Sequence, residues 1–335
     1  MNTQEIKNYI STLSLLDNLL HIDDNYFIVN LDWLTNRDYQ NQGVNELIYI
    51  AGDHCKKTFI FLARDGVNCN LTGLSYVITQ IVQNLDLTAD KCFIYSYQDI
   101  SVPNTTFVEF DVLQMWCSMI FNEIKFLPLA KNTFQKRFSA LIGRHDLFRL
   151  KLVKHLYENH KEQSLLSYNS NIANWNYRFS SDFFKEDQAW YQTHCPLLLD
   201  FEKPQGWVAF QESLTNIHKH YESYFIEIVC ETDSHSNRFF TEKTLKNFYL
   251  GKSFILFAGP KSLEYLKLKG FRTFSPFIDE SYDNISCPNK RLKSILSEID
   301  RIANLEQSQL NDIFLSLRDT FIHNRENFTK ICLTC

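Results

Sequence analysis

Strand-like and helix-like patterns alternate along this chain, and no other feature of the sequence constrains the fold as strongly. Strands that are separated by helices pair in parallel, and the helices then cover the sheet. In the first third we expect strands, rich in β-branched and aromatic residues, at Glu46–Ala51, Lys57–Ala63 and Lys91–Tyr97, and helices at Leu71–Leu85 and Val112–Ile124. The alternation predicts an α/β fold.

A second set of alternating elements begins near Lys131. Its expected strands are Arg137–Ile142, Tyr224–Glu231, Ser253–Ala258 and a last one within Lys267–Phe274; its expected helices are Leu147–Glu158, Gln211–His220, Thr241–Tyr249, Lys290–Asn304 and Gln307–His323. The aromatic-rich segment Ala173–Glu202 breaks this pattern, and we interpret it as an insertion. A sequence of 335 residues, at roughly 100–200 residues per domain, favours two domains.

Charge and cysteine content narrow the class of protein. The formal net charge of -5 argues against broad nucleic-acid binding through a basic face. The sequence contains no apolar run of the roughly 18 residues that cross a bilayer, and the first twenty residues read as an amphipathic helix rather than a signal peptide. Nine scattered cysteines are typical of reduced thiols, so we expect a cytoplasmic protein. Cys332 and Cys335 form a C-x-x-C pair that lacks the two further ligands of a zinc site.

The segment from Thr241 places a charged pair in the first turn of a helix, directly beyond a strand. Thr241 is well placed as the N-cap, and Glu242 and Lys243 follow it. A helix N-terminus attracts phosphate, Lys243 adds a compact positive charge, and Glu242 is able to accept bonds from the hydroxyls of a ribose. The plain alternative is that Glu242 stabilises the helix dipole and Lys243 is solvated.

A family resemblance favours the first interpretation. The run TEKTLKNFYLGKSFILFAG resembles the donor-site motif of α1,3-fucosyltransferase-like enzymes. It is still more similar to a phage and giant-virus branch with T-E-K-T-x-K-P, a later G-F-x-T-F and then D-E-S-Y-D. This chain has GFRTF at 270–274 and DESYD at 279–283, and it departs from the branch at Asn247, where proline is usual.

The resemblance implies a GT-B-like α/β fold with two Rossmann-like lobes and a cleft between them. It implies an acceptor lobe at 1–130, a nucleotide-sugar donor lobe at 131–304 and a C-terminal helical segment at 305–335 that packs back on the lobes. It also places a set of residues in the donor site: Arg149 and Arg144 near the diphosphate, Glu231 at the end of its strand, Asn237 in the following loop, Thr241, Glu242, Lys243 and Gly259.

The same resemblance implies a glycosyltransferase that moves a sugar from a nucleoside diphosphate, GDP- or UDP-linked, to an acceptor hydroxyl. Cationic side chains would stabilise the departing diphosphate. The sequence contains no D-x-D for a metal, and its nearest pattern, Glu109 and Asp111, is expected to begin a helix. We therefore expect metal-independent, inverting transfer without a cofactor.

An inverting enzyme needs a carboxylate base from the acceptor side. Asp65, in ARDG after a strand, is the first candidate, and Asp53 is the second. His54 and His145 are candidates for phosphate or hydroxyl contacts, although a lone histidine is more often structural.

Several alternatives stay open from the sequence. Trp175 and Trp190 either stack on a ligand or pack in a core. The acceptor is a glycan, a protein or a modified DNA base, and DNA would require a basic groove and an extruded base. A non-catalytic nucleotide-binding scaffold is the rival of a different class. A dehydrogenase is set aside because G-x-G-x-x-G is absent from the sequence.

Overall fold

A computed structural model describes most of the chain: residues 20–31, 42–63, 71–96, 100–109, 112–124, 127–143, 146–168, 185–197, 220–231 and 236–333. The chain divides into two compact units, Met1–Val112 and Leu113–Cys335. Each unit is built around its own sheet, which is wholly parallel in the second unit and parallel except for β1 in the first, so the expected α/β class is confirmed.

The first unit contains a five-stranded sheet whose strands follow the order of the chain. β1 (Leu20–Ile22) pairs antiparallel with β2 (Tyr26–Asn30), and β3 (Thr58–Ala63), β4 (Cys92–Ser96) and β5 (Thr106–Glu109) add in parallel. Because parallel crossovers are right-handed, a chain that steps across a sheet in one direction puts its helices on one face. In the part of this unit that the structure describes, the strand order does not reverse, so there is no topological switch point.

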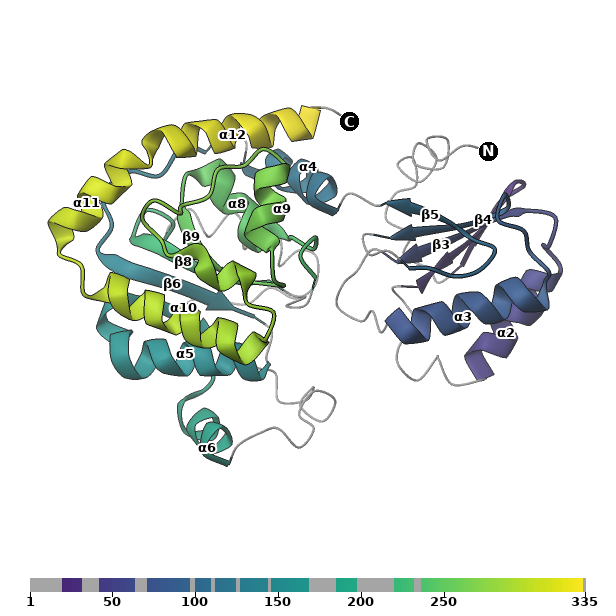
Figure 1. The fold of residues 1–335 in the computed structure, drawn as a ribbon, viewed down its shortest axis with the longest axis horizontal. Coiled ribbons are helices and arrows are strands. Elements are labelled where there is room, and N and C mark those ends of the chain that lie inside the picture. The colour runs from purple at the N-terminus through teal and green to yellow at the C-terminus, as the bar shows by residue number, and fades with distance from the viewer. Residues whose placement is uncertain are drawn as a thin grey trace. The chain divides into compact units, whose positions relative to one another are not determined.

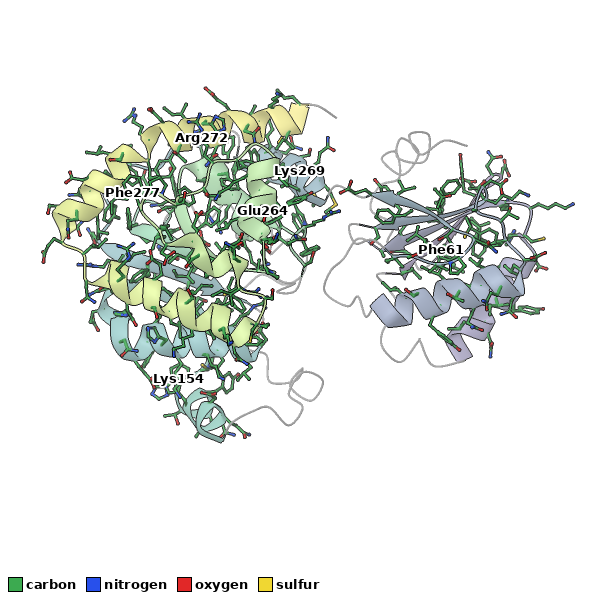
Figure 2. The ribbon with its side chains drawn as sticks, viewed as in Figure 1. Phe61, Lys154, Glu264, Lys269, Arg272 and Phe277 are labelled. Atoms are coloured by element: carbon green, nitrogen blue, oxygen red, sulfur yellow. The ribbon has the colours of Figure 1, made fainter. Side chains whose placement is uncertain are left out.

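Two helices cover one face of this sheet, as Figure 1 shows. They are α2 (Gln42–Gly52) and α3 (Leu71–Asn84), which contact each other. Phe61 of β3, labelled in Figure 2, is fully buried in the same unit. The expected strand at 46–51 is wrong, because that segment lies within α2. Val44, Leu47 and Ala51 are buried at helical spacing, which is the pattern that fixes the helix.

The second unit contains a four-stranded, wholly parallel sheet in the order β7-β6-β8-β9. Its strands are β6 (Lys136–Ile142), β7 (Ser164–Tyr168), β8 (Tyr224–Cys230) and β9 (Ser253–Phe257). From β6 the chain steps to β7 on one side and then returns to add β8 on the other side. The direction of travel therefore reverses between β6 and β8, and that reversal is a topological switch point.

Helices cover both faces of this second sheet (Figure 1). On one face α5 (Leu147–His160) packs against α10 (Pro288–Ala303), and on the other lie α8 (Glu242–Leu250) and α9 (Ser262–Leu268). The reversal explains the two layers, because right-handed crossovers on either side of a switch point project to opposite faces. The remaining helices are α4 (Val112–Ile124), α6 (Lys185–His194), α11 (Gln307–Ser316) and α12 (Arg318–Leu333), with short 3-10 turns η2 (Lys161–Gln163) and η4 (Glu280–Asn284).

The boundary between the units falls before α4, N-terminal to the boundary that the sequence predicted near residue 130. Leu113, Cys117 and Ile120 of α4 are buried in the core of the second unit, and this burial draws the helix into that unit. The single helix expected at 307–323 is two helices, α11 and α12, with Leu317 between them. α12 packs against α8.

The strand expected within 267–274 does not form. After α9 the chain turns at Gly270, which has a positive φ of 86°, and continues in an extended segment whose backbone bonds to a side chain of α12. The Asn324 amide accepts from Arg272 N at 2.7 Å and donates to Arg272 O at 2.8 Å. Figure 2 labels Arg272 beside this helix. A helix side chain thus satisfies the peptide groups that a neighbouring strand would otherwise bond.

No helix in the described ranges is long and apolar enough to cross a membrane.

A lysine is buried at the edge of the second sheet where its parallel strands begin. Lys252 is 0% exposed, its Nζ donates to the carbonyl of Tyr224, and the same Nζ lies 4.6 Å from the centre of the Tyr224 ring. Burial lowers the pKa of this ammonium from 10.5 to about 7, against the opposing charges of Glu227 and Glu222.

We predict that Lys252 makes stability depend on pH. Between pH 7 and 10.5 the unfolded chain binds more protons at this position than the folded chain, so the free energy of unfolding rises with pH and falls as pH drops toward 7. Against Lys252→Met, the wild type should gain up to about 1.4 kcal/mol per pH unit in that window. Urea unfolding at several pH values measures this difference. Lys261→Met, at an exposed site, is the control, and parallel curves for wild type and Lys252→Met would contradict the prediction.

Candidate functional site

The switch point of the second unit brings together two residues that the sequence singled out. β6 ends at Ile142 and leads into α5, which carries Arg149; β8 ends at Cys230, and Glu231 follows it. In open parallel sheets, ligands bind outside the carboxyl ends of strands at such a reversal. The geometry around Arg149 and Glu231 therefore defines the candidate site.

Arg149 is held in one orientation by its neighbours. Its side chain is buried; its Nε lies 3.0 Å from Asp146 Oδ2, and its NH2 group donates to the carbonyl of Glu231. Asp146 is also the N-cap of α5, accepting from Arg149 N at 2.9 Å. One aspartate thus caps the helix and orients the guanidinium beside the end of β8.

Glu231 holds the first turn of α8 in place. Its side chain is fully buried; Oε1 accepts from Thr241 N at 3.0 Å and from Thr244 Oγ1 at 2.5 Å, while Oε2 accepts from Thr241 Oγ1 at 2.8 Å. A buried carboxylate needs such donors. The sequence assigned Glu231 to ligand contact, whereas the geometry makes it the group that joins the end of β8 to the start of α8.

The first turn of α8 presents the charged pair. Thr241 is its N-cap, accepting from Lys243 N. The side chains of Glu242 and Lys243 are 22% and 28% exposed, with Lys243 Nζ 3.6 Å from Glu242 Oε1 and 3.2 Å from Thr241 Oγ1. Burial by itself raises the pKa of Glu242, but the charges of Lys243 and Lys246 outweigh it and hold the pKa below its ordinary value. Glu242 is therefore an anion that accepts hydrogen bonds.

A buried ion pair supports this turn from below. Lys246 Nζ lies 2.7 Å from Glu227 Oε1 of β8, and both side chains are 4% exposed. The same Nζ donates to Lys243 O at 3.2 Å, and Glu227 Oε2 accepts from the hydroxyl of Tyr224 at 3.2 Å. A pair this deep is costly to break on one side only. The ion pair therefore fixes the position of α8 relative to β8.

The helices α5, α8 and α9 all start at the carboxyl edge of the sheet, and their N-termini differ in what already occupies them. Asp146 caps α5. The carboxylate of Asp283 accepts from Leu263 N at 3.1 Å and from Glu264 N at 3.2 Å at the start of α9. The cap of α8 is instead the neutral hydroxyl of Thr241. The carboxylates of Glu231 and Glu242 also lie at this N-terminus, so α8 differs from α5 and α9 in the part-exposed Lys243 that its first turn adds to the helix dipole.

The loop before α8 and the turn after β9 approach each other at this edge. Gly259 is buried, and its N donates to Ser236 O at 3.2 Å. Asn237 is half-buried next to Ser236. Arg238, which the sequence analysis missed, is exposed in the same loop, with its guanidinium carbon 5.9 Å from the centre of the Tyr265 ring. Its position between a strand end and a helix start was the signal that could have identified it.

The two later motif blocks bond to each other and to the sheet. Glu280, in DESYD, accepts from Thr273 Oγ1 at 2.8 Å and from Phe274 N at 2.7 Å, both in GFRTF. The hydroxyl of Tyr282 accepts from Leu256 N of β9 at 3.1 Å. These two blocks therefore have an architectural role around α9.

Three other candidates lie in the turn before β3 or in a hydrophobic core. Asp53 is exposed in the turn between α2 and β3. It does not follow a strand, as the sequence suggested, because 46–51 is helical; it lies at the amino end of β3, the wrong end for a ligand site of a parallel sheet. His54 follows it, with its ring 5.6 Å from that of Phe27. Trp190 is buried and stacks on His194 at 4.8 Å, which favours the packing role.

The remaining sequence candidates are Cys332, Glu109 and a group that lies outside the described residues. A hydrogen bond with Cys117 lowers the pKa of the Cys332 thiol, and burial opposes this shift. Glu109 is exposed at the end of β5 and does not begin a helix. Asp65, Arg144, His145, Asp111, Trp175, Cys335 and the helix expected at 211–220 lie outside the described residues.

Comparison with known proteins adds no assignment: no family model, no curated protein and no solved structure matches this chain.

Proposed function

We propose that this protein is a glycosyltransferase that binds a nucleoside-diphosphate sugar at the switch point of its second unit. The proposal gives the diphosphate to Lys243, Arg149 and the N-terminus of α8, and the ribose to Glu242. It includes a GT-B-like arrangement in which the first unit provides the acceptor side. The motif resemblance in the sequence supplies the reaction class.

The observation that carries the proposal is the state of the α8 N-terminus. It lies at the carboxyl edge of a parallel sheet beside a reversal of strand order, its cap is the neutral Thr241, and Lys243 lies within its first turn. A phosphate at that position would receive the helix dipole and a side-chain cation together. The anionic, part-exposed Glu242 next to it suits a ligand with neighbouring hydroxyl groups.

The chemistry then follows from charge. In the transfer, the acceptor oxygen forms a bond to the anomeric carbon while the bond from that carbon to the diphosphate oxygen breaks. The diphosphate leaves with additional negative charge, and the acceptor proton passes to a carboxylate base. Preorganised cations lower the barrier to such a departure. We assign this role to Lys243 and Arg149, the latter fixed in advance by Asp146 and the carbonyl of Glu231.

Thermal unfolding with a panel of nucleoside diphosphates and their sugars, with and without Mg²⁺, tests the proposal. A ligand at 100 times its dissociation constant adds about 2.7 kcal/mol of stability. We expect one diphosphate family to raise Tm without metal, and its sugar conjugate to be hydrolysed slowly. Binding without hydrolysis would favour the nucleotide-binding scaffold, and no shift with any member would remove the donor site.

Lys243→Ala should weaken binding of the nucleoside diphosphate about tenfold and leave binding of the free nucleoside unchanged, because a charge-assisted bond to phosphate is worth about 1.5–3 kcal/mol. Calorimetric titration with both ligands measures the two affinities. Lys261→Ala is the matched control, since Lys261 precedes the first turn of α9, whose N-terminus Asp283 already occupies. Equal losses for both ligands would take Lys243 out of the phosphate role.

Glu242→Ala should reduce the preference for ribose over 2′-deoxyribose nucleotides about tenfold, because the variant loses an acceptor for the 2′-hydroxyl. Competition binding with the paired nucleotides gives this ratio directly. Glu264→Ala, which removes a first-turn acid of α9, is the control and should leave the ratio unaltered. A ratio that is the same in Glu242→Ala and wild type would refute the ribose contact.

A further inference from the structure

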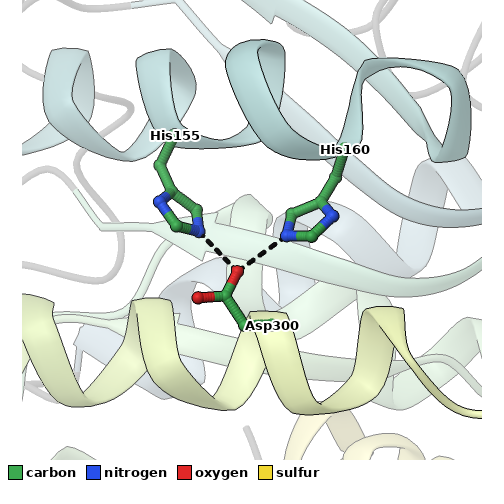
Figure 3. A group of neighbouring side chains, drawn as sticks. All are labelled: His155, His160 and Asp300. Carbon is green, nitrogen blue, oxygen red and sulfur yellow. Dashed lines mark hydrogen bonds and ion pairs between the residues drawn. The ribbon is translucent and has the colours of Figure 1, made fainter.

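Two histidines and an aspartate meet between α5 and α10, at the edge of the second sheet opposite to the switch point. His155 and His160 lie in the last two turns of α5, and Asp300 lies near the end of α10. Figure 3 shows both rings turned toward one carboxylate. Each Nε2 is 2.7 Å from Asp300 Oδ1.

We propose that His155, His160 and Asp300 bind one divalent transition-metal ion of the Zn²⁺ class. The three ligand atoms lie within 4.8 Å of one another, and they form the only such group of three or more His, Cys, Asp or Glu side chains in the described ranges. Two imidazole nitrogens and a carboxylate oxygen are a donor set that Zn²⁺, Co²⁺ and Ni²⁺ accept and that Ca²⁺ and Mg²⁺ do not prefer.

The side chains would adjust by about 1 Å to coordinate an ion. Tetrahedral Zn²⁺ with bonds of about 2.0–2.2 Å holds neighbouring ligand atoms about 3.4 Å apart. Asp300 Oδ1 would therefore withdraw from 2.7 Å to about 3.4 Å from each nitrogen, and the two Nε2 atoms, within 4.8 Å of each other, would approach by up to about 1.4 Å. The two rings already direct their Nε2 atoms to the same point, so the ion would replace the two bridging protons.

Burial and charge also suit a metal ligand set. The side chains of His155 and His160 are 20% and 12% exposed, whereas Asp300 is 46% exposed, so an ion and a completing water can reach the carboxylate from solvent. Burial alone raises the pKa of Asp300, but the bonds from His160 and His155 outweigh it and hold the pKa below its ordinary value. The carboxylate is therefore ionised and ready to bind.

An outer contact orients one of the rings. The amide of Asn159 lies 3.4 Å from His155 Nδ1 and also donates to His155 O at 3.0 Å. A metal-bound histidine donates its second ring N–H to an acceptor, so binding of an ion would require the Asn159 amide to present its oxygen, in place of its NH2 group, to His155 Nδ1. Asn159 is thus a positioning residue for His155.

The site is separate from the proposed nucleotide site. α5 runs back from the carboxyl edge, where Asp146 caps it, to the start of β7, where Ser164 Oγ donates to His160 O at 2.8 Å. An ion here would join α5 to α10 on one face of the sheet and stabilise that helix pair. The proposal therefore stands or fails independently of sugar transfer.

The test is titration of the full-length, metal-free protein with Zn²⁺ and with Co²⁺ under reducing conditions. We expect one equivalent of Zn²⁺ to bind and to raise Tm, and Co²⁺ to give visible ligand-field absorption without thiolate charge-transfer bands. Binding should strengthen with pH across the titration of histidine and release protons. Thiolate bands would assign the ion to cysteines instead and overturn the proposal.

Variants then locate the ion. Asp300→Asn and His160→Gln should each weaken Zn²⁺ binding at least 100-fold and abolish the rise in Tm, and Asn159→Ala should weaken it about tenfold. His323→Gln, which changes a histidine bonded to Gly270 O outside the cluster, is the control and should bind as the wild type does. Circular dichroism verifies that each variant is folded. Two ligand variants are used so that the test can still be made if one of them does not fold. Unchanged affinity in either folded ligand variant would overturn the proposal.

Discussion

Residue 231 joins the two helices that form the candidate site. Its side chain accepts three hydrogen bonds from Thr241 and Thr244 at the start of α8, and its carbonyl accepts from Arg149 of α5. α5 and α8 lie on opposite faces of the sheet (Figure 1). The residue that follows β8 therefore links helices of two different layers. A buried carboxylate with all its donors in place can tolerate little movement of any partner, because each lost bond leaves a desolvated charge.

That constraint determines which charged side chains are buried and which reach the surface. Glu231 is fully buried and engaged, and the guanidinium of Arg149 bonds to Asp146 and to Glu231, while Lys246 is paired with Glu227 beneath the helix. What the arrangement presents at the surface is the part-exposed Glu242 and Lys243. The buried groups therefore act as preorganisation: they hold the first turn of α8, with its dipole and its cation, in one position.

Local signals in the sequence predicted local structure well. The cap at Thr241 depends on residues within α8 itself and is confirmed, and α8 ends at Leu250, one residue beyond the expected helix, before Gly251 with its positive φ of 69°. Errors arose where distant residues decide. The apolar run at 46–51 fits either period, and burial of Val44, Leu47 and Ala51 against the sheet selects the helix. The strand expected within 267–274 does not form, and Asn324 of α12 takes the bonds that a strand would have made.

The candidate site was predictable in its membership and not in its roles. Arg149, Glu231, Glu242 and Lys243 do converge at one edge, as a strand end followed by a helix start predicts. The buried carboxylate of Glu231 depends on a hydrogen bond from the hydroxyl of Thr244. A comparison of motifs does not reveal that bond. The sequence did not predict the switch point, because β7 was not expected and the order of strands does not follow from a single sequence.

The motif blocks also differ in what they can say about function. GFRTF and DESYD bond to each other through Glu280 and to α9 and β9 through Asp283 and Tyr282, so their presence bears on the packing around α9. A chain could keep both blocks for that reason and bind no nucleotide. The first turn of α8 carries charged, part-exposed groups at the switch point. Since fold and function are separable, the glycosyltransferase proposal depends on Glu242 and Lys243 at the surface and on the buried charge of Arg149, and the residues of GFRTF and DESYD matter to it through the packing around α9.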